Sequence, residues 1–453
     1  MLRITNPATG EPIGEVETDT PATIAGKLAR ARAAQPGWAA TPVAERVAAL
    51  RRFRDRLHAD REVLARLLSE EVGKPITQAR SEIANTQRLE FFLENAAAVL
   101  ADEKVMEDAA GSERISWEPY GVVANISAWN YPYFVGANVF PPALLAGNAV
   151  LYKPSEFATR TGLAMVERLH EAGVPADVMP AVVGDGAIGA ALVDADVDAI
   201  FFTGSYPTGV RIAQAAAPRL LHVQLELGGK DPIYVCDDAP AEATAAAVAD
   251  GAFYNTGQSC CAVERVYVHR AIAQPFIDAF AATVRGFVVG DPLDDGTYIG
   301  PVTRRAQLDV LDAQVADARA KGATVVTGGH RLEGAGHFFA PTVLTNVDHR
   351  MAVMRDESFG PIIGIQVVGD DAEAAALMRD TEYGLTAGVY TPDRARAEHL
   401  LATMPTGTVY WNCCDRVTPR LPWSGRKHSG VGLTLSTHGI RAFTRPKAWH
   451  LRG

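Results

Sequence analysis

Apolar side chains in the first hundred residues recur at the spacing of amphipathic helices. Over Val43–Glu71 they return every three or four residues, which predicts a helix with one buried face. The same spacing predicts helices over Pro21–Ala34 and Ile76–Leu100, and Ile13–Val16 resembles a short strand. Gly73-Lys74-Pro75 separates the second helix from the third, because glycine and proline end helices.

From Gly121 the pattern changes to short apolar runs that alternate with helical stretches. The predicted strands are Val122–Ser127, Ala149–Lys153, Met179–Val183, Ala199–Thr203 and His222–Leu227. The predicted helices are Tyr133–Ala146, Thr159–Ala172, Ala187–Val193 and Gly209–Ala217. Continuously apolar strands separated by helices indicate a parallel sheet that is covered on both faces. We therefore predict a doubly wound α/β domain, which binds ligands at the carboxyl ends of its strands.

A second α/β series begins after Gly228-Gly229-Lys230. Its predicted strands are Ile233–Val235, Val266–His269, Thr324–Thr327, Ile362–Val368 and Gly388–Tyr390. Its predicted helices are Ala241–Phe253, Gln274–Phe287, Arg304–Lys321, Ala372–Arg379 and Arg394–Met404. Outside both series, Glu103–Trp117 is strand-like near its end, and the tail Thr437–His450 is predicted to be a strand with an aromatic-rich face.

Composition narrows the class of protein. The chain has 453 residues, enough for two or three domains, and its 48% hydrophobic and 21% charged content is typical of a folded protein. A net charge of −10, with both signs mixed along the chain, excludes a basic nucleic-acid surface. The five cysteines fit neither a disulfide framework nor a zinc site, so we expect a reducing compartment and no metal.

No membrane segment is expected. The most apolar stretch, Val139–Tyr152, is interrupted by Pro141-Pro142 and Gly147-Asn148 and is too short to span a bilayer. A turn at Asn6-Pro-Ala-Thr-Gly10 stands where a signal peptide would need an apolar run. The expected location is therefore the cytoplasm.

A pair of cysteines, Cys260-Cys261, follows a Gly-Gln turn and precedes the apolar strand Val266–His269. A cysteine on a loop between elements can meet a ligand. The alternative is a small buried hydrophobic residue, which is the more common role of a free cysteine. The loop alone does not decide between the two.

Two glycine turns and a lysine follow strands of the first sheet. Gly184-Asp-Gly-Ala-Ile-Gly189 has the G-x-G-x-x-G form, and Gly204-Ser-Tyr-Pro-Thr-Gly209 opens a helix whose N–H groups, with the Ser205 hydroxyl, suit a pyrophosphate. Lys153 and Glu156 can both hydrogen-bond a ribose diol. The alternative is that the glycines serve tight turns only and that Lys153-Pro-Ser-Glu156 is an exposed turn.

Three further side chains carry possible chemistry. Glu226 stands between two leucines, and an acid in apolar surroundings is expected to have the raised pKa that a general base needs. Asn130, in Trp129-Asn-Tyr-Pro132, follows the first strand of the sheet, and Glu357 precedes a glycine-proline turn. The alternative in each case is a solvent-facing strand or loop residue.

Together these stretches are similar, in order and spacing, to the NAD(P)-dependent aldehyde dehydrogenase superfamily. The similarity runs from Asn6 to the C-terminal strand. It is carried by Trp129-Asn-Tyr-Pro, Lys153-Pro-Ser-Glu, Phe202-Thr-Gly-Ser, Leu225-Glu-Leu-Gly-Gly-Lys, Gly257-Gln-Ser-Cys-Cys-Ala-Val-Glu-Arg, Glu357-Ser-Phe-Gly-Pro and Pro422-Trp-Ser-Gly-Arg-Lys-His-Ser-Gly. Seven motifs in the family's order do not arise by chance.

The resemblance implies an NAD(P)-dependent oxidation of an aldehyde to a carboxylic acid. Cys260 would be the nucleophile that forms a thiohemiacetal, with Asn130 and the Cys260 N–H as oxyanion donors. Hydride transfer to nicotinamide would leave a thioester, and Glu226 would activate the water that hydrolyses it. The presence of Glu226 favours a free acid product over transfer to coenzyme A.

The resemblance also implies the cofactor contacts. Lys153 and Glu156 would bind the adenosine ribose, Ser205 the pyrophosphate and Glu357 the nicotinamide ribose. The remaining implied cofactor-binding residues are Trp129, Gly184, Gly189, Gly204 and Phe359. Because Glu156 would repel a 2′-phosphate, NAD is the expected cofactor, although Lys153 leaves NADP open.

The sequence departs from the family's pattern in three places. Tyr206-Pro207 replaces small and acidic residues in the second glycine turn, which weakens the expectation of phosphate contacts there. Asn138 stands where members specific for succinic semialdehyde have an arginine, which counts against that substrate. Arg416 and Arg420, in the loop expected at the substrate entrance, are interpreted as solvated rim charges rather than as carboxylate contacts.

The family's organisation implies an NAD-binding domain over residues 1–101 and 120–229 and a catalytic domain over 230–435. Residues 102–119 and 436–453 would form a small β oligomerisation element, which predicts a homodimer or homotetramer. The other partner is a small-molecule aldehyde. Three rival functions remain. They are a non-catalytic dinucleotide-binding or structural protein, a semialdehyde-specific dehydrogenase of the succinic semialdehyde type, and a thioesterase-like hydrolase that would use Cys260 without NAD.

Overall fold

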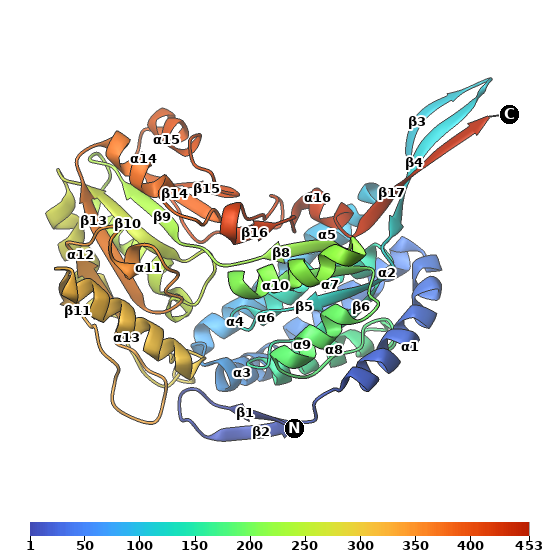
Figure 1. Ribbon diagram of the computed structural model, residues 1–453, viewed down its shortest axis with the longest axis horizontal. Coiled ribbons are helices and arrows are strands. Elements are labelled where there is room, and N and C mark those ends of the chain that lie inside the picture. The colour runs from blue at the N-terminus through green and yellow to red at the C-terminus, as the bar shows by residue number, and fades with distance from the viewer. Residues whose placement is uncertain (453) are drawn as a thin grey trace.

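Two α/β lobes, each built on its own sheet, make up most of the molecule (Figure 1). The structure is a computed structural model, and residues 1–452 are described. A hairpin of β1 (Leu2–Thr5) and β2 (Pro12–Val16) opens the chain. A separate three-stranded sheet projects from the first lobe (Figure 1).

The first lobe holds a five-stranded sheet in the order β16-β8-β7-β5-β6. Its strands are β5 (Val122–Ile126), β6 (Ala149–Lys153), β7 (Ala199–Thr203), β8 (His222–Glu226) and β16 (Gly430–Val431). The helices that follow its strands are α6 (Pro132–Val135), α7 (Phe140–Leu145), α8 (Thr159–Glu171), α9 (Gly186–Asp194) and α10 (Tyr206–Ala216). Four strands are parallel, as predicted, and the fifth, β16, arrives from the far end of the chain and pairs antiparallel to β8.

One expected strand of this sheet is not formed as predicted. Met179–Val183 runs along β6 but makes only a single parallel bridge, between Tyr152 and Ala181. Pro180 lacks the N–H that a ladder needs, which confines this segment to the edge of the sheet.

The helices before the sheet are more broken than their apolar spacing predicts. They are α1 (Pro21–Ala40), α2 (Val43–Ala59), α3 (Arg61–Val72), α4 (Ile76–Ala84), the 3₁₀ turn η1 (Asn85–Arg88) and α5 (Leu89–Val99). The predicted helix Val43–Glu71 therefore breaks at Asp60, and Ile76–Leu100 breaks at η1. The predicted helix Tyr133–Ala146 also divides, because Pro141 and Pro142 fit only the first turn of a new helix.

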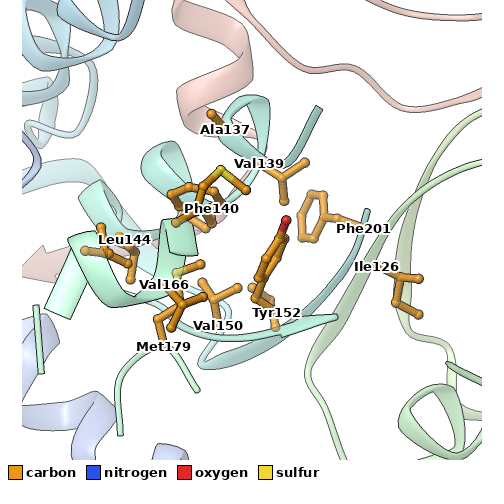
Figure 2. Close-up of a cluster of buried hydrophobic side chains, with 14 of the residues drawn as sticks. Ile126, Ala137, Val139, Phe140, Leu144, Val150, Tyr152, Val166, Met179 and Phe201 are labelled. Atoms are coloured by element: carbon orange, nitrogen blue, oxygen red, sulfur yellow. The ribbon is translucent and has the colours of Figure 1, made fainter. Parts of the chain in front are cut away.

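The core of this lobe is a continuous apolar cluster under both faces of the sheet. Figure 2 shows Tyr152 of β6 near Val150 of the same strand, Phe140 of α7 and Phe201 of β7. The Phe140 and Tyr152 rings lie edge to face with centroids 5.7 Å apart. Strands with every residue buried, such as β5 and β6, explain the continuous apolar runs in the sequence.

The second lobe holds a seven-stranded sheet in the order β11-β12-β13-β10-β9-β14-β15. Its strands are β9 (Asp231–Val235), β10 (Val263–His269), β11 (Thr324–Thr327), β12 (Thr342–Thr345), β13 (Ile362–Val368), β14 (Thr386–Tyr390) and β15 (Thr408–Trp411). Its helices are α11 (Ala241–Phe253), α12 (Ala273–Arg285), α13 (Arg305–Ala320), α14 (Asp371–Arg379) and α15 (Arg394–Leu401). The predicted strands are all present, while β12 and β15 were not predicted and β11 is antiparallel.

The projecting sheet combines β3 (Glu103–Asp108), β4 (Gly111–Pro119) and β17 (Thr444–Arg452). The tail is thus a strand only from Thr444, since Ser436–Arg441 forms helix α16. Ile440 and Phe443 are fully buried in the first lobe's core, and this packing explains why the tail is helical there. None of the helices in residues 1–452 combines the length and hydropathy that crossing a bilayer requires.

Candidate active site

A cavity of about 670 Å³ is lined by residues of both lobes. Cys260 and Glu226, which the sequence separates by thirty-four positions, both line it. Five further side chains of the lining are Tyr131, Val135, Asn138, Val417 and Trp423. The entrance loop contributes Arg416 to the lining, whereas Arg420 is exposed.

The Cys260 loop is held by an unusual run of backbone conformations. Asn255, Thr256 and Gly257 all have positive φ, of 54°, 58° and 70°. At Gly257 a Cβ would lie 2.3 Å from the Gly360 carbonyl oxygen, so the Gly-Gln turn requires glycine. The turn leaves Cys260 half-buried at the cavity, which is the position expected of a reactive cysteine rather than of a core residue.

Asn130 is tied to the same loop. Its side-chain nitrogen donates to the backbone carbonyl of Gln258 at 3.1 Å, and the backbone carbonyl of Asn130 accepts from Asn255 Nδ2 at 3.2 Å. Asn130 is buried, 4% exposed, and is not among the side chains that line the cavity. One of its two amide hydrogens is therefore engaged, and one remains for an oxyanion beside Cys260.

The two adjacent cysteines have different surroundings. Cys261 is buried, and its Sγ donates to Asp415 Oδ1 at 2.9 Å. Contact with the Cys260 thiol, burial and the Asp415 carboxylate raise the pKa of Cys261 well above its usual range. Cys261 is thus held as a neutral thiol, which leaves Cys260 as the better nucleophile.

Glu226 ends β8 with its carboxyl group in the cavity wall. Thr203 Oγ1, at the end of the neighbouring strand β7, donates to Glu226 Oε2 at 3.5 Å, and Oε1 is buried without a hydrogen-bond partner. Burial raises the pKa of Glu226 to about 7, while the Thr203 hydrogen bond and the Arg88 charge act in the opposite direction. A carboxyl group that titrates near neutrality, with one oxygen free, suits a general base.

Lys153 and Glu156 follow β6, as the sequence placed them. Lys153 is 3% exposed, and its ammonium donates to the Pro154 carbonyl at 3.1 Å. Burial lowers its pKa, although the Glu156 and Asp185 charges oppose the change. Glu156 remains partly exposed. A buried ammonium with hydrogens to spare fits a ribose hydroxyl, so these residues fit the adenosine end of a dinucleotide.

The first glycine turn differs from a simple phosphate cradle. Gly184 has a φ of +154° that glycine tolerates, and Gly189 lies against Lys153. The Asp185 carboxylate, however, caps α9 by accepting from the Ala187 N–H at 2.9 Å. It occupies the helix N-terminus that a phosphate would use and adds a like charge there.

The second glycine turn leads from β7 into α10. The Gly204 N–H donates to the Glu226 carbonyl at 3.0 Å, and Ser205 precedes the helix without capping it. The Ser205 hydroxyl donates to Thr208 Oγ1 at 3.1 Å. Pro207 supplies no N–H, while Tyr206 stacks on His428 with ring centroids 3.9 Å apart. This N-terminus therefore offers fewer donors than the motif alone suggested.

Glu357 and Phe359 meet the first lobe across the seam between the sheets. Glu357 Oε1 accepts from the Gly229 N–H at 3.1 Å, and burial followed by the Glu264 charge raises its pKa to about 8. Phe359 has a φ of 45° and packs edge to face on Trp129, with ring centroids 5.5 Å apart. The structure thus brings Trp129, Glu357 and Phe359 together.

A buried ion pair supports this loop, and sequence reasoning missed it. Lys230 Nζ lies 2.6 Å from Glu264 Oε2 and donates to Ser358 Oγ at 3.0 Å. Glu264 in turn accepts from the backbone N–H groups of Ser358 and Phe359, both at 3.0 Å. Both charged residues stand inside the quoted motifs, which was the signal available in the sequence.

Two other residues of the cavity wall were missed as well. Asp415 is half-buried, and desolvation of its carboxyl group raises its pKa to about 6. Arg88, at the end of η1, also lines the cavity. Among residues 1–452, no group of three or more His, Cys, Asp or Glu is placed to hold a metal ion.

The comparison with known proteins decides the family. The model of the aldehyde dehydrogenase family matches residues 1–449. The chain belongs to the aldehyde dehydrogenase family. It is 36% identical to a protein named betaine aldehyde dehydrogenase from Rhizobium leguminosarum bv. trifolii, over 97% of this chain and 92% of that protein.

Solved structures agree in fold. The structure of PnpE in complex with nicotinamide adenine dinucleotide has a TM-score of 0.96 and 33% identity, covering 99% of this chain and 93% of that one. An NADP-dependent enzyme of Escherichia coli has a TM-score of 0.95 and 32% identity, covering 99% and 94%. The aldehyde dehydrogenase fold and an NAD(P)-dependent oxidation of aldehydes, both expected from the sequence, are confirmed.

Proposed function

We propose that Cys260 is the nucleophile of this aldehyde dehydrogenase. The Cys260 thiolate adds to the aldehyde carbon, and the carbonyl π electrons move to oxygen, which gives a thiohemiacetal oxyanion. The free amide hydrogen of Asn130 and the backbone N–H of Cys260 would hold this oxyanion. Oriented donors of this kind commonly supply about 3 to 4 kcal/mol of transition-state stabilisation.

Oxidation follows when the oxyanion collapses and the hydrogen on carbon leaves as hydride. When bound, the nicotinamide ring accepts that hydride. Lys153 and Glu156, with Gly184 and with Gly189 packed against Lys153, would hold the adenosine ribose. Ser205 and Gly204 would hold the pyrophosphate, and Trp129, Glu357 and Phe359 the nicotinamide side. The product on the protein is a Cys260 thioester.

Glu226 is the base of the second half-reaction. Its ionised carboxylate takes a proton from water, the hydroxide adds to the thioester carbonyl, and the Cys260 thiolate leaves as the carboxylic acid forms. The observation that carries the whole proposal is that Cys260 and Glu226 line one cavity, with the pKa of Glu226 raised to about 7 by burial.

Replacement of the two cysteines tests the nucleophile. The Cys260→Ser variant should lose aldehyde-dependent NADH formation. The control, Cys261→Ser, makes the same substitution at the adjacent position and should keep most of that activity. Retention of full activity by Cys260→Ser would remove the assignment. Formation of acid from a thioester without NAD would indicate a thioesterase-like hydrolase. NAD binding without NADH formation from any aldehyde of a panel would indicate a non-catalytic protein.

Cofactor preference and assembly complete the proposal. NAD is favoured because Glu156 would repel a 2′-phosphate. Residues 102–119 and 436–453, from which the projecting three-stranded sheet of β3, β4 and β17 is drawn, are the proposed oligomerisation element, beside an NAD-binding domain (1–101, 120–229) and a catalytic domain (230–435). Its projection from the first lobe (Figure 1) supports a homodimer or homotetramer. Five free cysteines support a cytoplasmic location. Light scattering of the purified protein measures the assembly.

A further inference from the structure

Arg88 is a charged side chain of the cavity wall that takes part in no step described above. Its guanidinium carbon lies 4.9 Å from the centroid of the Phe134 ring. Its Nε and Nη2 atoms are buried, and neither has a hydrogen-bond partner. Burial lowers the pKa of Arg88 to about 10, so the side chain remains cationic at neutral pH.

Three other buried cations of this chain have partners within the protein. Lys74 pairs with Glu82, and Lys230 pairs with Glu264 at 2.6 Å. Arg46 has an unpaired Nε, but its Nη1 donates to three backbone carbonyls. A buried charge without partners is costly, so proteins keep one mainly where a ligand completes it.

The acids of the cavity wall do not compete for Arg88, because each has its own donor. Asp415 accepts from Cys261 Sγ at 2.9 Å, Asp250 accepts from the Tyr298 hydroxyl at 2.5 Å, and Glu82 accepts from the Tyr133 N–H at 2.9 Å. Glu226 attracts Arg88 through space but forms no hydrogen bond with it. Arg88 therefore lines the cavity with no carboxylate of the protein bound to its Nε and Nη2 atoms.

We propose that Arg88 recognises a carboxylate at the far end of the substrate, so that the substrates are ω-carboxy aldehydes. This inference rests on the proposed function and adds a substrate class to it. A guanidinium presents paired N–H groups that match the two oxygens of a carboxylate. Phe134, Val135 and Val417 line the same cavity and suit the hydrocarbon chain between the two ends.

The recognition comes from an element that the sequence had not singled out. Asn138, where an arginine would indicate succinic semialdehyde, lines the cavity without a charge. Arg88 supplies the positive charge from η1 instead. It would repel the quaternary ammonium of betaine aldehyde, the compound in the name of several relatives.

Steady-state kinetics on matched aldehydes test the inference. The probes are 4-oxobutanoate and 6-oxohexanoate, the neutral butanal and hexanal of equal length, and betaine aldehyde. The wild-type enzyme should favour at least one carboxy aldehyde over its neutral match in kcat/KM. Hydrogen bonds to a charged partner make a preference of about 10- to 100-fold the expected size. The Arg88→Gln variant should lose that preference through KM for the anionic substrate. Arg420→Gln, the same change at an exposed site, should retain it.

Each contrary result has a distinct meaning. If the wild-type enzyme prefers butanal, hexanal or betaine aldehyde, the inference is wrong. This result needs no variant, so it does not depend on whether Arg88→Gln folds. If Arg88→Gln lost kcat/KM equally on anionic and neutral aldehydes, Arg88 would be a positioning residue for Glu226. If Arg416→Gln lost the preference for carboxy aldehydes, Arg416 at the cavity entrance would be the residue that binds the carboxylate. Silence on every aldehyde would instead refute the proposed function.

Discussion

Replacing Glu226 by glutamine should separate the two half-reactions of this enzyme. The Glu226→Gln variant keeps the size and one acceptor oxygen of the side chain but cannot take a proton from water. Acylation of Cys260 does not need that proton transfer, so the variant should still release one NADH per active site in a burst. Steady turnover should fall by about 10²- to 10⁴-fold, the usual contribution of a general base.

The same carboxyl group sets the pH dependence of the wild-type enzyme. With a pKa of about 7 for Glu226, the ionised fraction rises from about one tenth at pH 6 to about nine tenths at pH 8. Deacylation-limited turnover should therefore increase about tenfold over this range. The Glu226→Gln variant should lose this limb of the profile.

Stability gives an independent measure of the same pKa. The folded pKa of Glu226, about 7, lies above the ordinary value of 4.5. A raised folded pKa means that the contribution of Glu226 to stability is fully present below pH 4.5 and is lost as pH rises through 7. A difference of about 2.5 pKa units corresponds to about 3 kcal/mol. Glu226→Gln cannot ionise, so its stability relative to wild type should increase by up to that amount between pH 5 and pH 8.

Stopped-flow NADH fluorescence, pH profiles and thermal melts of both proteins make these comparisons. Glu71→Gln is the matched control, because Glu71 is also buried with a pKa raised to about 7 but accepts its hydrogen bonds from the start of α8, away from the cavity. Glu71→Gln should keep the burst and the pH limb. Unchanged turnover in Glu226→Gln, or loss of the limb in Glu71→Gln, would refute the assignment of the base.

Two other changes test the cofactor side. Glu156→Gln removes the charge expected to repel a 2′-phosphate, so the ratio of kcat/KM for NADP to that for NAD should rise, by about tenfold for 1.4 kcal/mol of repulsion; a constant ratio would show that Glu156 does not select the cofactor. Glu264→Gln leaves Lys230 buried without its partner and should destabilise the protein by about 3 to 5 kcal/mol. It should also raise the KM for NAD, because Glu264 holds the Phe359 loop. A melting temperature equal to that of the wild type would contradict the stabilising role that we assign to the Lys230–Glu264 pair.

The sequence predicted the layout of this site where the chemistry follows chain order. Strand ends of a parallel sheet meet at one edge, and Lys153 and Glu226 do end β6 and β8 at that edge. The Cys260 loop and the glutamate could be paired because the family's motifs carry both. Packing across the seam could not be predicted, since it depends on contacts between residues far apart in the chain, such as that of Trp129 with Phe359.

Arg88 shows why the rest escaped prediction. The spacing of apolar residues favoured one helix over Ile76–Leu100, and on that helix Arg88 would share a face with Phe92 and Ala96. A charge on an apolar face was the available signal. The break at η1 is a tertiary effect that the spacing does not contain, and the cavity that receives the guanidinium is completed by residues more than a hundred positions away.

Unsatisfied charge in this fold is concentrated where the chemistry is proposed. Glu226 Oε1 and the Arg88 nitrogens are buried without partners, and both side chains border the cavity. Ion pairs away from it, such as Lys230 with Glu264, are complete. Structures tolerate such orphaned groups where function needs them, because the substrate restores the missing partners. The water that Glu226 activates and a carboxylate on Arg88 would together give these atoms partners, which is the physical reason to treat the two proposals as parts of a single site.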